Sequence, residues 1–110
     1  MVTAETAIVL PVLLLVLVCA VAAVTVVGVQ LRCVDAAREG ARAAARGETD
    51  AVVAELAGGV APAGAVTAVE PAGDRVRVTV SVEVSPLGPV PLRTRVSAAA
   101  VAQREPDGQS

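Results

Sequence analysis

The chain of 110 residues contains no histidine, lysine, asparagine, phenylalanine, tyrosine or tryptophan. Without histidine, the commonest general base and metal ligand is missing. Without aromatic side chains, no aromatic belt can anchor a membrane helix, and a folded core must be built from Val, Leu and Ala. Nine basic and eleven acidic residues give a net charge of −2, which argues against a nucleic-acid partner.

The residue combinations typical of active sites and cofactor sites are also missing. The sequence has no nucleophile–base pair, no Gly-rich phosphate loop and no cluster of acids. Ser81, Ser85 and Ser97 lie on or beside expected strands, in ordinary solvent-facing positions. We therefore predict no catalytic, cofactor-binding or metal-binding residues, no cofactor and no enzymatic activity.

Two cysteines are too few for a disulfide framework. On a continuous helix Cys19 and Cys33 would lie about 21 Å apart, whereas a disulfide joins Cα atoms within roughly 7 Å. We interpret Cys19 as a small apolar packing residue. Cys33 is expected to be a free thiol that a membrane-impermeant reagent can reach, with pairing to another chain as the alternative.

Residues 6–31 carry no formal charge. As a helix they would span about 39 Å, enough to cross a hydrocarbon core of ~30 Å with some tilt. Fifteen of residues 6–29 are Val, Leu or Ile, and each of these favours insertion near the bilayer centre. The run from Thr6 to Leu31 is therefore predicted to be a single transmembrane helix in contact with membrane lipid.

Three other interpretations fit this run less well. A cleaved secretory signal would have a basic start and a core of about 7–15 apolar residues, and the run has neither. A buried core helix would need more surrounding chain than the roughly 80 remaining residues supply. An amphipathic surface helix would need a polar face, which is missing.

Beyond the span the sequence predicts more helix. Residues 32–46 are rich in alanine, a strong helix former. The face expected to pack consists of Leu31, Val34, Ala37, Ala41, Ala44 and Ala45. A second, short helix is expected over 51–57, capped by Thr49 or Asp50 and ended by Gly58–Gly59.

A small sheet is expected to follow. Strands are predicted over 65–69, 75–84 and 92–101, with a turn at 71–74 and a Pro-rich connection at 86–91. The middle strand alternates valine with polar residues, which is typical of a sheet with one solvated face. Its buried face would hold Val76, Val78, Val80, Val82 and Val84. The predicted fold class is α+β, a long N-terminal transmembrane helix extending into a small domain with a short helix and an antiparallel three-stranded sheet.

Glu5 stands alone just ahead of the uncharged run, where the helix enters the lipid. Its simplest role is that of a flanking residue whose carboxylate reaches the headgroups. A neutral residue would insert at lower cost, however, and acids at membrane depth usually have a partner. The α-amine of Met1 on an identical, staggered neighbouring chain would be a cation at this height.

Three segments carry a family resemblance: the opening Met1–Glu5, the Val/Leu run with Pro11 inside it, and the Arg- and Ala-rich segment 32–47. They resemble the TadE-like minor pilins (pseudopilins) of the tight-adherence, or Flp-type, branch of type IV pili, and most of all the actinobacterial members. The resemblance implies a pilin-like fold and three kinds of partner: other pilins, pilus-assembly platform proteins and a prepilin peptidase that cuts after a glycine. It also implies that Met1 is mature residue 1, usually N-methylated, and that Glu5 guides assembly.

No leader and no glycine precede Met1 in this sequence. Three explanations stay open: the chain is the processed form, the gene start was assigned too late, or this member is not processed. The first two explain why a glutamate stands at position five. The DNA just upstream of Met1 distinguishes a pilin from a plain membrane anchor: a short basic leader ending in glycine indicates a pilin, and an in-frame stop codon immediately upstream indicates a plain anchor.

Two signals disagree on orientation. The positive-inside rule would put the Arg-rich segment 32–46 in the cytoplasm. The resemblance implies the opposite, with the C-terminal part outside the bacterial cytoplasmic membrane, and we follow the resemblance. The expected parts are 1–31 as transmembrane and assembly helix, 32–102 as a small extracytoplasmic α+β domain, and 103–110 as a disordered tail.

The expected function is structural. The chain would be a minor pilin that inserts by its N-terminal helix and takes part in assembly of a Flp-type pilus involved in cell adhesion. The alternative is a single-pass accessory protein of an envelope or secretion system that never enters a filament.

Overall fold

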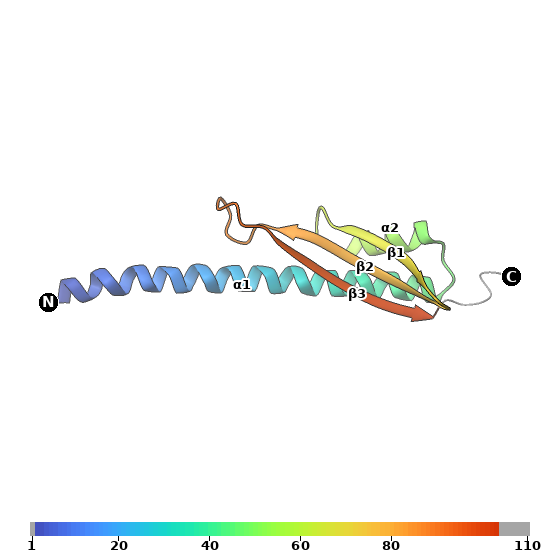
Figure 1. The fold of residues 1–110 in the computed structure, drawn as a ribbon, viewed down its shortest axis with the longest axis horizontal. Coiled ribbons are helices and arrows are strands. Elements are labelled where there is room, and N and C mark those ends of the chain that lie inside the picture. Colours follow the sequence, from blue (N-terminus) through green and yellow to red (C-terminus); the bar gives the residue numbers. More distant parts are fainter. Residues whose placement is uncertain (1, 104–110) are drawn as a thin grey trace.

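The computed structural model describes residues 2–103. Its elements are α1 (Val2–Ala45), α2 (Asp50–Val60), β1 (Val66–Ala72), β2 (Arg75–Val84) and β3 (Thr94–Gln103). Figure 1 shows α1 running along the whole molecule, which measures 79 × 20 × 20 Å, with α2 and the sheet gathered along its second half. The predicted α+β fold class is confirmed. We call residues 30–103, which comprise the second half of α1, α2 and the sheet, the C-terminal domain.

The helix α1 has 44 residues, which corresponds to a length of about 66 Å. It ends where Gly47 adopts a positive φ of 83°, a conformation that costs glycine little. The amide of Gly47 bonds to Ala44 O at 3.0 Å and that of Glu48 to Ala43 O at 3.2 Å, the two bonds of a Schellman motif. The chain therefore turns back at this point, which places α2 against α1.

The helix α2 begins as predicted and ends later than predicted. The Thr49 side chain accepts a hydrogen bond from the amide of Val52 at 3.3 Å, which confirms Thr49 as the N-cap. The helix then continues through Gly58–Gly59, which we had expected to end it. It stops where Ala61 becomes extended, the conformation that the following Pro62 favours.

The sheet is three-stranded and antiparallel, as predicted, and its strands lie in the order β1-β2-β3. The strand β2 has the predicted bounds, whereas β3 lies two residues further along the chain than the predicted 92–101. The strand β1 extends through Pro71, a residue tolerated there because β1 is an edge strand. The turn to β2 is consequently only two residues long, Gly73 and Asp74, with Gly73 supplying the positive φ of 71°.

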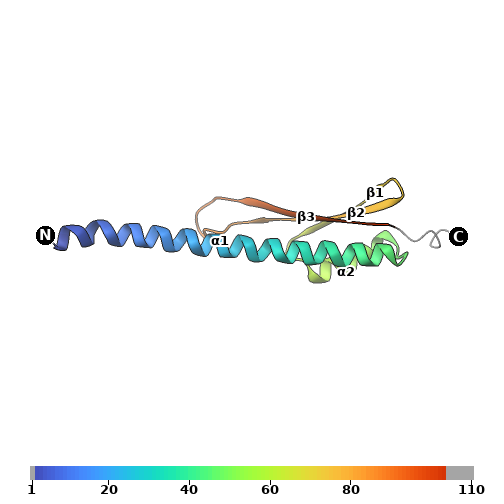
Figure 2. The same ribbon diagram turned by 90° about the horizontal axis from the view of Figure 1, so that it is seen from below.

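The predicted valine face of β2 is the centre of the core. Val76, Val78, Val80 and Val82 are buried and Val84 is half-buried. On α1 the buried positions are Cys33, Ala36, Ala37, Gly40, Ala41, Ala43 and Ala44. The predicted packing face of α1 was thus partly wrong, because its largest member, Leu31, is 59% exposed. The smallest side chains face the sheet, and they allow a close approach between the two layers seen edge-on in Figure 2.

The helix α1 lies close to β2 at Gly40. A Cβ atom at this position would lie 2.7 Å from Cγ1 of Val78 and 3.3 Å from the Cβ of Ala57. Val78 is fully buried and its β-branched side chain is stiff, so its methyl group has little room to move aside. The missing side chain at Gly40 is therefore what lets the helix lie this close to the sheet.

Gly40→Ala is expected to destabilise the C-terminal domain by about 1–2 kcal/mol, because overpacking outweighs the gain of ~1 kcal/mol in helix propensity. Gly58→Ala in α2 is the matched control, since nothing lies within 4 Å of its added Cβ, and it should be neutral or stabilising. Unfolding can be followed in detergent by far-UV circular dichroism. A Gly40→Ala protein as stable as the parent would show that the sheet can shift away from α1 at no cost.

Candidate functional site

The first half of α1 is not covered by the rest of the described chain. Every residue from 3 to 21 is exposed, and Ala22 and Val26 are the first positions that are partly covered. The exposed side chains include Leu10, Leu13, Leu14, Leu15, Leu17 and Val24, each more than half accessible. We call residues 3–21 the bare segment. An apolar surface of this extent needs another apolar environment, either lipid or other proteins.

The dimensions of α1 fit a lipid bilayer. The helix is long and apolar enough to cross a membrane. From Glu5 to Val26 the axial distance is about 32 Å, close to the ~30 Å thickness of a hydrocarbon core. With Glu5 at one headgroup boundary, the opposite boundary therefore falls near the residues where the C-terminal domain begins to cover the helix.

Thr25, a polar residue in the second half of the uncharged run, forms its side-chain hydrogen bond within the helix. The hydroxyl of Thr25 donates to Val21 O at 2.9 Å, the i−4 bond that threonine commonly makes in membrane helices. Gln30 is the next polar residue, and its Nε2 donates to Ser97 O of β3 at 3.2 Å. These bonds leave the segment between Glu5 and Gln30 compatible with lipid, and they tie the end of that segment to the sheet.

Glu5 lies in the first turn of α1 and is exposed. A carboxylate is favoured at this end of a helix because the backbone amides of the first turn carry a partial positive charge. Met1, whose α-amine we expect to pair with Glu5 of a neighbouring chain, lies outside the described residues. The assembly roles of Met1 and Glu5 and the limits of the Thr6–Leu31 span stay predictions.

Cys33 does not have the exposed position that we expected for it. Its side chain is completely buried, in the cluster that contains Ala36, Val80 and Val96. Burial raises the pKa of the Cys33 thiol, which further disfavours the reactive thiolate. The expectation that a thiol reagent reaches Cys33 in the folded protein is therefore wrong, and pairing with another chain would require the domain to open. Cys19, by contrast, is exposed on the bare segment.

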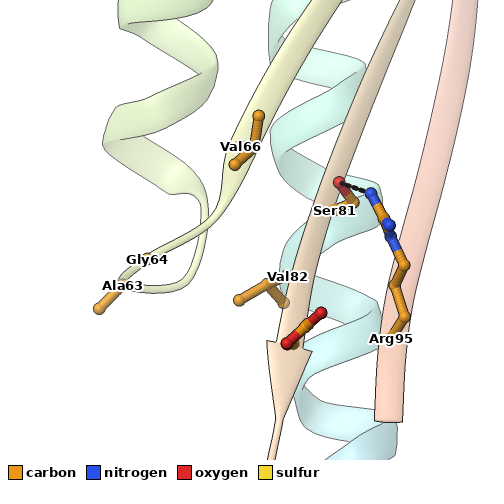
Figure 3. Close-up of a pocket in the computed structure, with 7 residues that line it drawn as sticks. Ala63, Gly64, Val66, Ser81, Val82 and Arg95 are labelled. Atoms are coloured by element: carbon orange, nitrogen blue, oxygen red, sulfur yellow. Dashed lines mark hydrogen bonds between the residues drawn. The ribbon is translucent and has the colours of Figure 1, made fainter. Parts of the chain in front are cut away.

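A pocket of about 320 Å³ lies beside the start of β1 (Figure 3). Its lining residues are Ala63, Gly64, Val66, Ser81, Val82, Glu83 and Arg95. It exists because β1 pairs with β2 only as far as Val66 and Ser81, so the end of β2 has no strand on that side. Arg95 donates to the Ser81 hydroxyl at 3.5 Å. This arrangement reflects unequal strand lengths and presents no nucleophile–base pair.

Within the described residues, no group of three or more Cys, Asp or Glu side chains could hold a metal ion. Of the features described above, the one that indicates a function is the apolar first half of α1, with the Glu5 carboxylate at its start.

Comparison with known proteins gives a family match that coincides with α1. The family model described as TadE-like protein matches residues 1–42, which lie within α1 apart from residue 1. Over 77 residues the chain is 44% identical to a Mycobacterium tuberculosis protein named Apoptosis inhibitor Rv3655c. The aligned part covers 70% of this chain and 61% of the relative, so the chain spans about three fifths of that protein's length. No solved structure gives a significant match.

The aligned 77 residues are too many to fit within the 44 residues of α1, so the similarity to the mycobacterial protein reaches into the C-terminal domain. The source of this relative also agrees with the actinobacterial likeness of the sequence. The family match over the long helix and the mycobacterial relative together confirm the resemblance of this chain to the TadE-like proteins.

Proposed function

We propose that this protein is a structural minor pilin, or pseudopilin, that inserts into the bacterial cytoplasmic membrane by α1 and takes part in assembly of a Tad (Flp-type) pilus. The observation that carries the proposal is the division of one continuous helix into two halves. The first half is apolar, bare and flanked by Glu5, whereas the second half forms the core of a folded domain.

This division suits a subunit that passes from a membrane into a filament. The bare segment requires apolar surroundings in both states, and lipid tails or the helices of other pilins supply them equally well. The C-terminal domain keeps its own core, so it need not refold when the surroundings of α1 change. Other pilins and the assembly platform are the proposed partners, and a prepilin peptidase joins them if a leader precedes Met1.

The proposal assigns no catalysis to the chain. It requires the C-terminal domain to lie outside the cytoplasm, against the positive-inside tendency of Arg32, Arg38, Arg42 and Arg46, which follow the span. Orientation is therefore the property that most sharply separates this function from other single-pass arrangements.

The orientation can be tested at Asp74, which is exposed in the β1–β2 turn at the end of the molecule far from the bare segment. An Asp74→Cys variant, made in a Cys19→Ala background, should react with a membrane-impermeant maleimide in intact cells. The protein should also stay with the membrane through a carbonate wash, which strips proteins held only by electrostatic attraction.

The parent Cys19→Ala protein is the control, because its remaining thiol, Cys33, is buried and should stay unlabelled. Labelling of Asp74→Cys only after cell lysis would place the C-terminal domain in the cytoplasm and refute the pilin function. Loss of the protein from carbonate-washed membranes would refute the transmembrane span itself.

A further inference from the structure

The connection between β2 and β3 lies in an uncharged stretch of nine residues, from Val84 to Leu92. No charged residue occurs between Glu83 and Arg93, whose side chains form an ion pair of 3.5 Å at the base of the loop. The loop still presents apolar side chains to its surroundings, since Val90 is 44% and Leu92 55% exposed. We call residues 85–92 the β2–β3 loop.

The β2–β3 loop lies at the end of the C-terminal domain that faces the bare segment. Both ribbon views show it beside α1, beyond the end of β2 and toward the N-terminus (Figures 1 and 2). Ala22 and Val26, one helical turn apart, are the first partly covered residues of α1. They lie about 26 Å and 32 Å from Glu5 along the helix, which brackets the far boundary of a ~30 Å hydrocarbon core. The loop therefore reaches the depth at which α1 leaves the lipid.

The backbone of this loop is unusually poor in free hydrogen-bond donors. Residues 86, 89 and 91 are prolines and have no N–H group. The amide of Gly88 bonds to Ser85 O at 3.3 Å, that of Val90 to Leu87 O at 3.4 Å and that of Leu92 to Val90 O at 2.7 Å. Within residues 86–92 only one other N–H group exists, that of Leu87. Unsatisfied N–H and C=O groups normally keep irregular backbone out of the hydrocarbon region. In this loop nearly all of the N–H groups are either absent or bonded, which lowers the cost of placing it at the boundary of that region.

We propose that the β2–β3 loop is a second membrane contact, which inserts Val90 and Leu92 into the boundary between headgroups and acyl chains. The charged pair Glu83–Arg93 would then mark the depth at which the loop returns to water. With α1 as the first contact, a second contact to one side of the helix would set the rotation and tilt of the C-terminal domain on the membrane. The inference rests on the proposed membrane span.

The test uses the full chain reconstituted at low density in vesicles of phosphatidylcholine and phosphatidylglycerol. An environment-sensitive fluorophore is attached at Val90→Cys or Leu92→Cys in the Cys19→Ala background, with buried Cys33 left in place. Val101→Cys is the matched control, because Val101 is 46% exposed but lies near the far end of β3. Lipids brominated high on their acyl chains should shift the emission of the two loop labels to the blue and quench it, and should leave the Val101 label unaffected.

Each other outcome counts against the loop contact. An unquenched label at Val90→Cys, with an emission like that of the Val101→Cys label, would show that the loop stays in water. A blue shift without quenching by brominated lipid, or one that disappears when the protein is diluted in lipid, would show that a second chain covers the loop. Flotation of the labelled protein with the vesicles separates the two proposals: a chain that floats without loop quenching refutes the loop contact alone, and a chain that does not float refutes the span as well.

Discussion

Val80→Asp is expected to unfold the C-terminal domain, whereas Thr79→Asp, one residue away on the same strand, should leave it folded. Val80 is completely buried and belongs to the core cluster that contains Cys33 and Ala37 of α1. No buried polar or charged residue is found in the described core, so a carboxylate at this site would have no partner there. Its burial costs several kcal/mol, a large share of the roughly 5 kcal/mol expected for a domain with so small a core.

Thr79 occupies the opposite face of β2 and is half-exposed, so an aspartate at this position can remain hydrated. The lower strand propensity of aspartate should cost at most about 1 kcal/mol. Cys33 offers a built-in measurement, because a thiol reagent reaches it only when the domain opens. In a Cys19→Ala background, the Val80→Asp variant should react at the rate of the denatured protein and the Thr79→Asp variant at the slow rate of the parent. Fast reaction in both variants would mean that β2 is buried on both faces.

The contrast between these two residues shows which parts of the fold the sequence determines locally. The bounds of β2 and its buried face follow from ten residues of alternating character, a pattern that only a half-buried strand explains. The long helix follows equally directly from the absence of charge between Glu5 and Arg32. The third strand was placed two residues too early, because the alanines at 98–100 occur on both faces and blur its alternation.

The sequence carries a weaker signal about which face of α1 is buried against the sheet. Residues 32–46 are mostly alanine and arginine, and alanine alone says little about which side of a helix is buried. We chose the side that contains Leu31, whereas the structure buries Cys33 and Gly40. A usable signal was present, since the smallest side chains recur at spacings of three and four along 33, 36, 40 and 43. The 2.7 Å contact that a Cβ at Gly40 would make depends on the distance between two layers, which no local pattern encodes.

The role of Glu5 is beyond prediction from one chain for a different reason: its expected partner belongs to another copy. The hypothesis is that the Glu5 carboxylate pairs with the α-amine of residue 1 on an adjacent pilin while both helices leave the bilayer. In low-dielectric surroundings this attraction is far stronger than in water, although loss of hydration offsets much of it. The pair is therefore expected to select the register between neighbouring subunits more than to add net stability.

Glu5→Gln keeps the size and polarity of the side chain and removes its charge. Insertion into the membrane should be unchanged or improved, because a neutral residue enters lipid at lower cost. Crosslinking to other pilins and piliation should both fall, since a net loss of only ~1.4 kcal/mol per contact lowers association about tenfold. Glu5→Asp should be partly defective, because its shorter side chain moves the charge without deleting it.

Two controls separate an assembly defect from a general loss of the protein. Glu48→Gln removes a carboxylate outside the bare segment and should assemble like the parent, and Cys33 should remain protected from thiol reagents in every variant because the C-terminal domain stays folded. The decisive comparison is crosslinking per membrane-inserted molecule in Glu5→Gln and in the parent. If the two values are equal and piliation is normal, Glu5 is only a flanking residue, and the register between subunits must be set by the apolar surface of the bare segment.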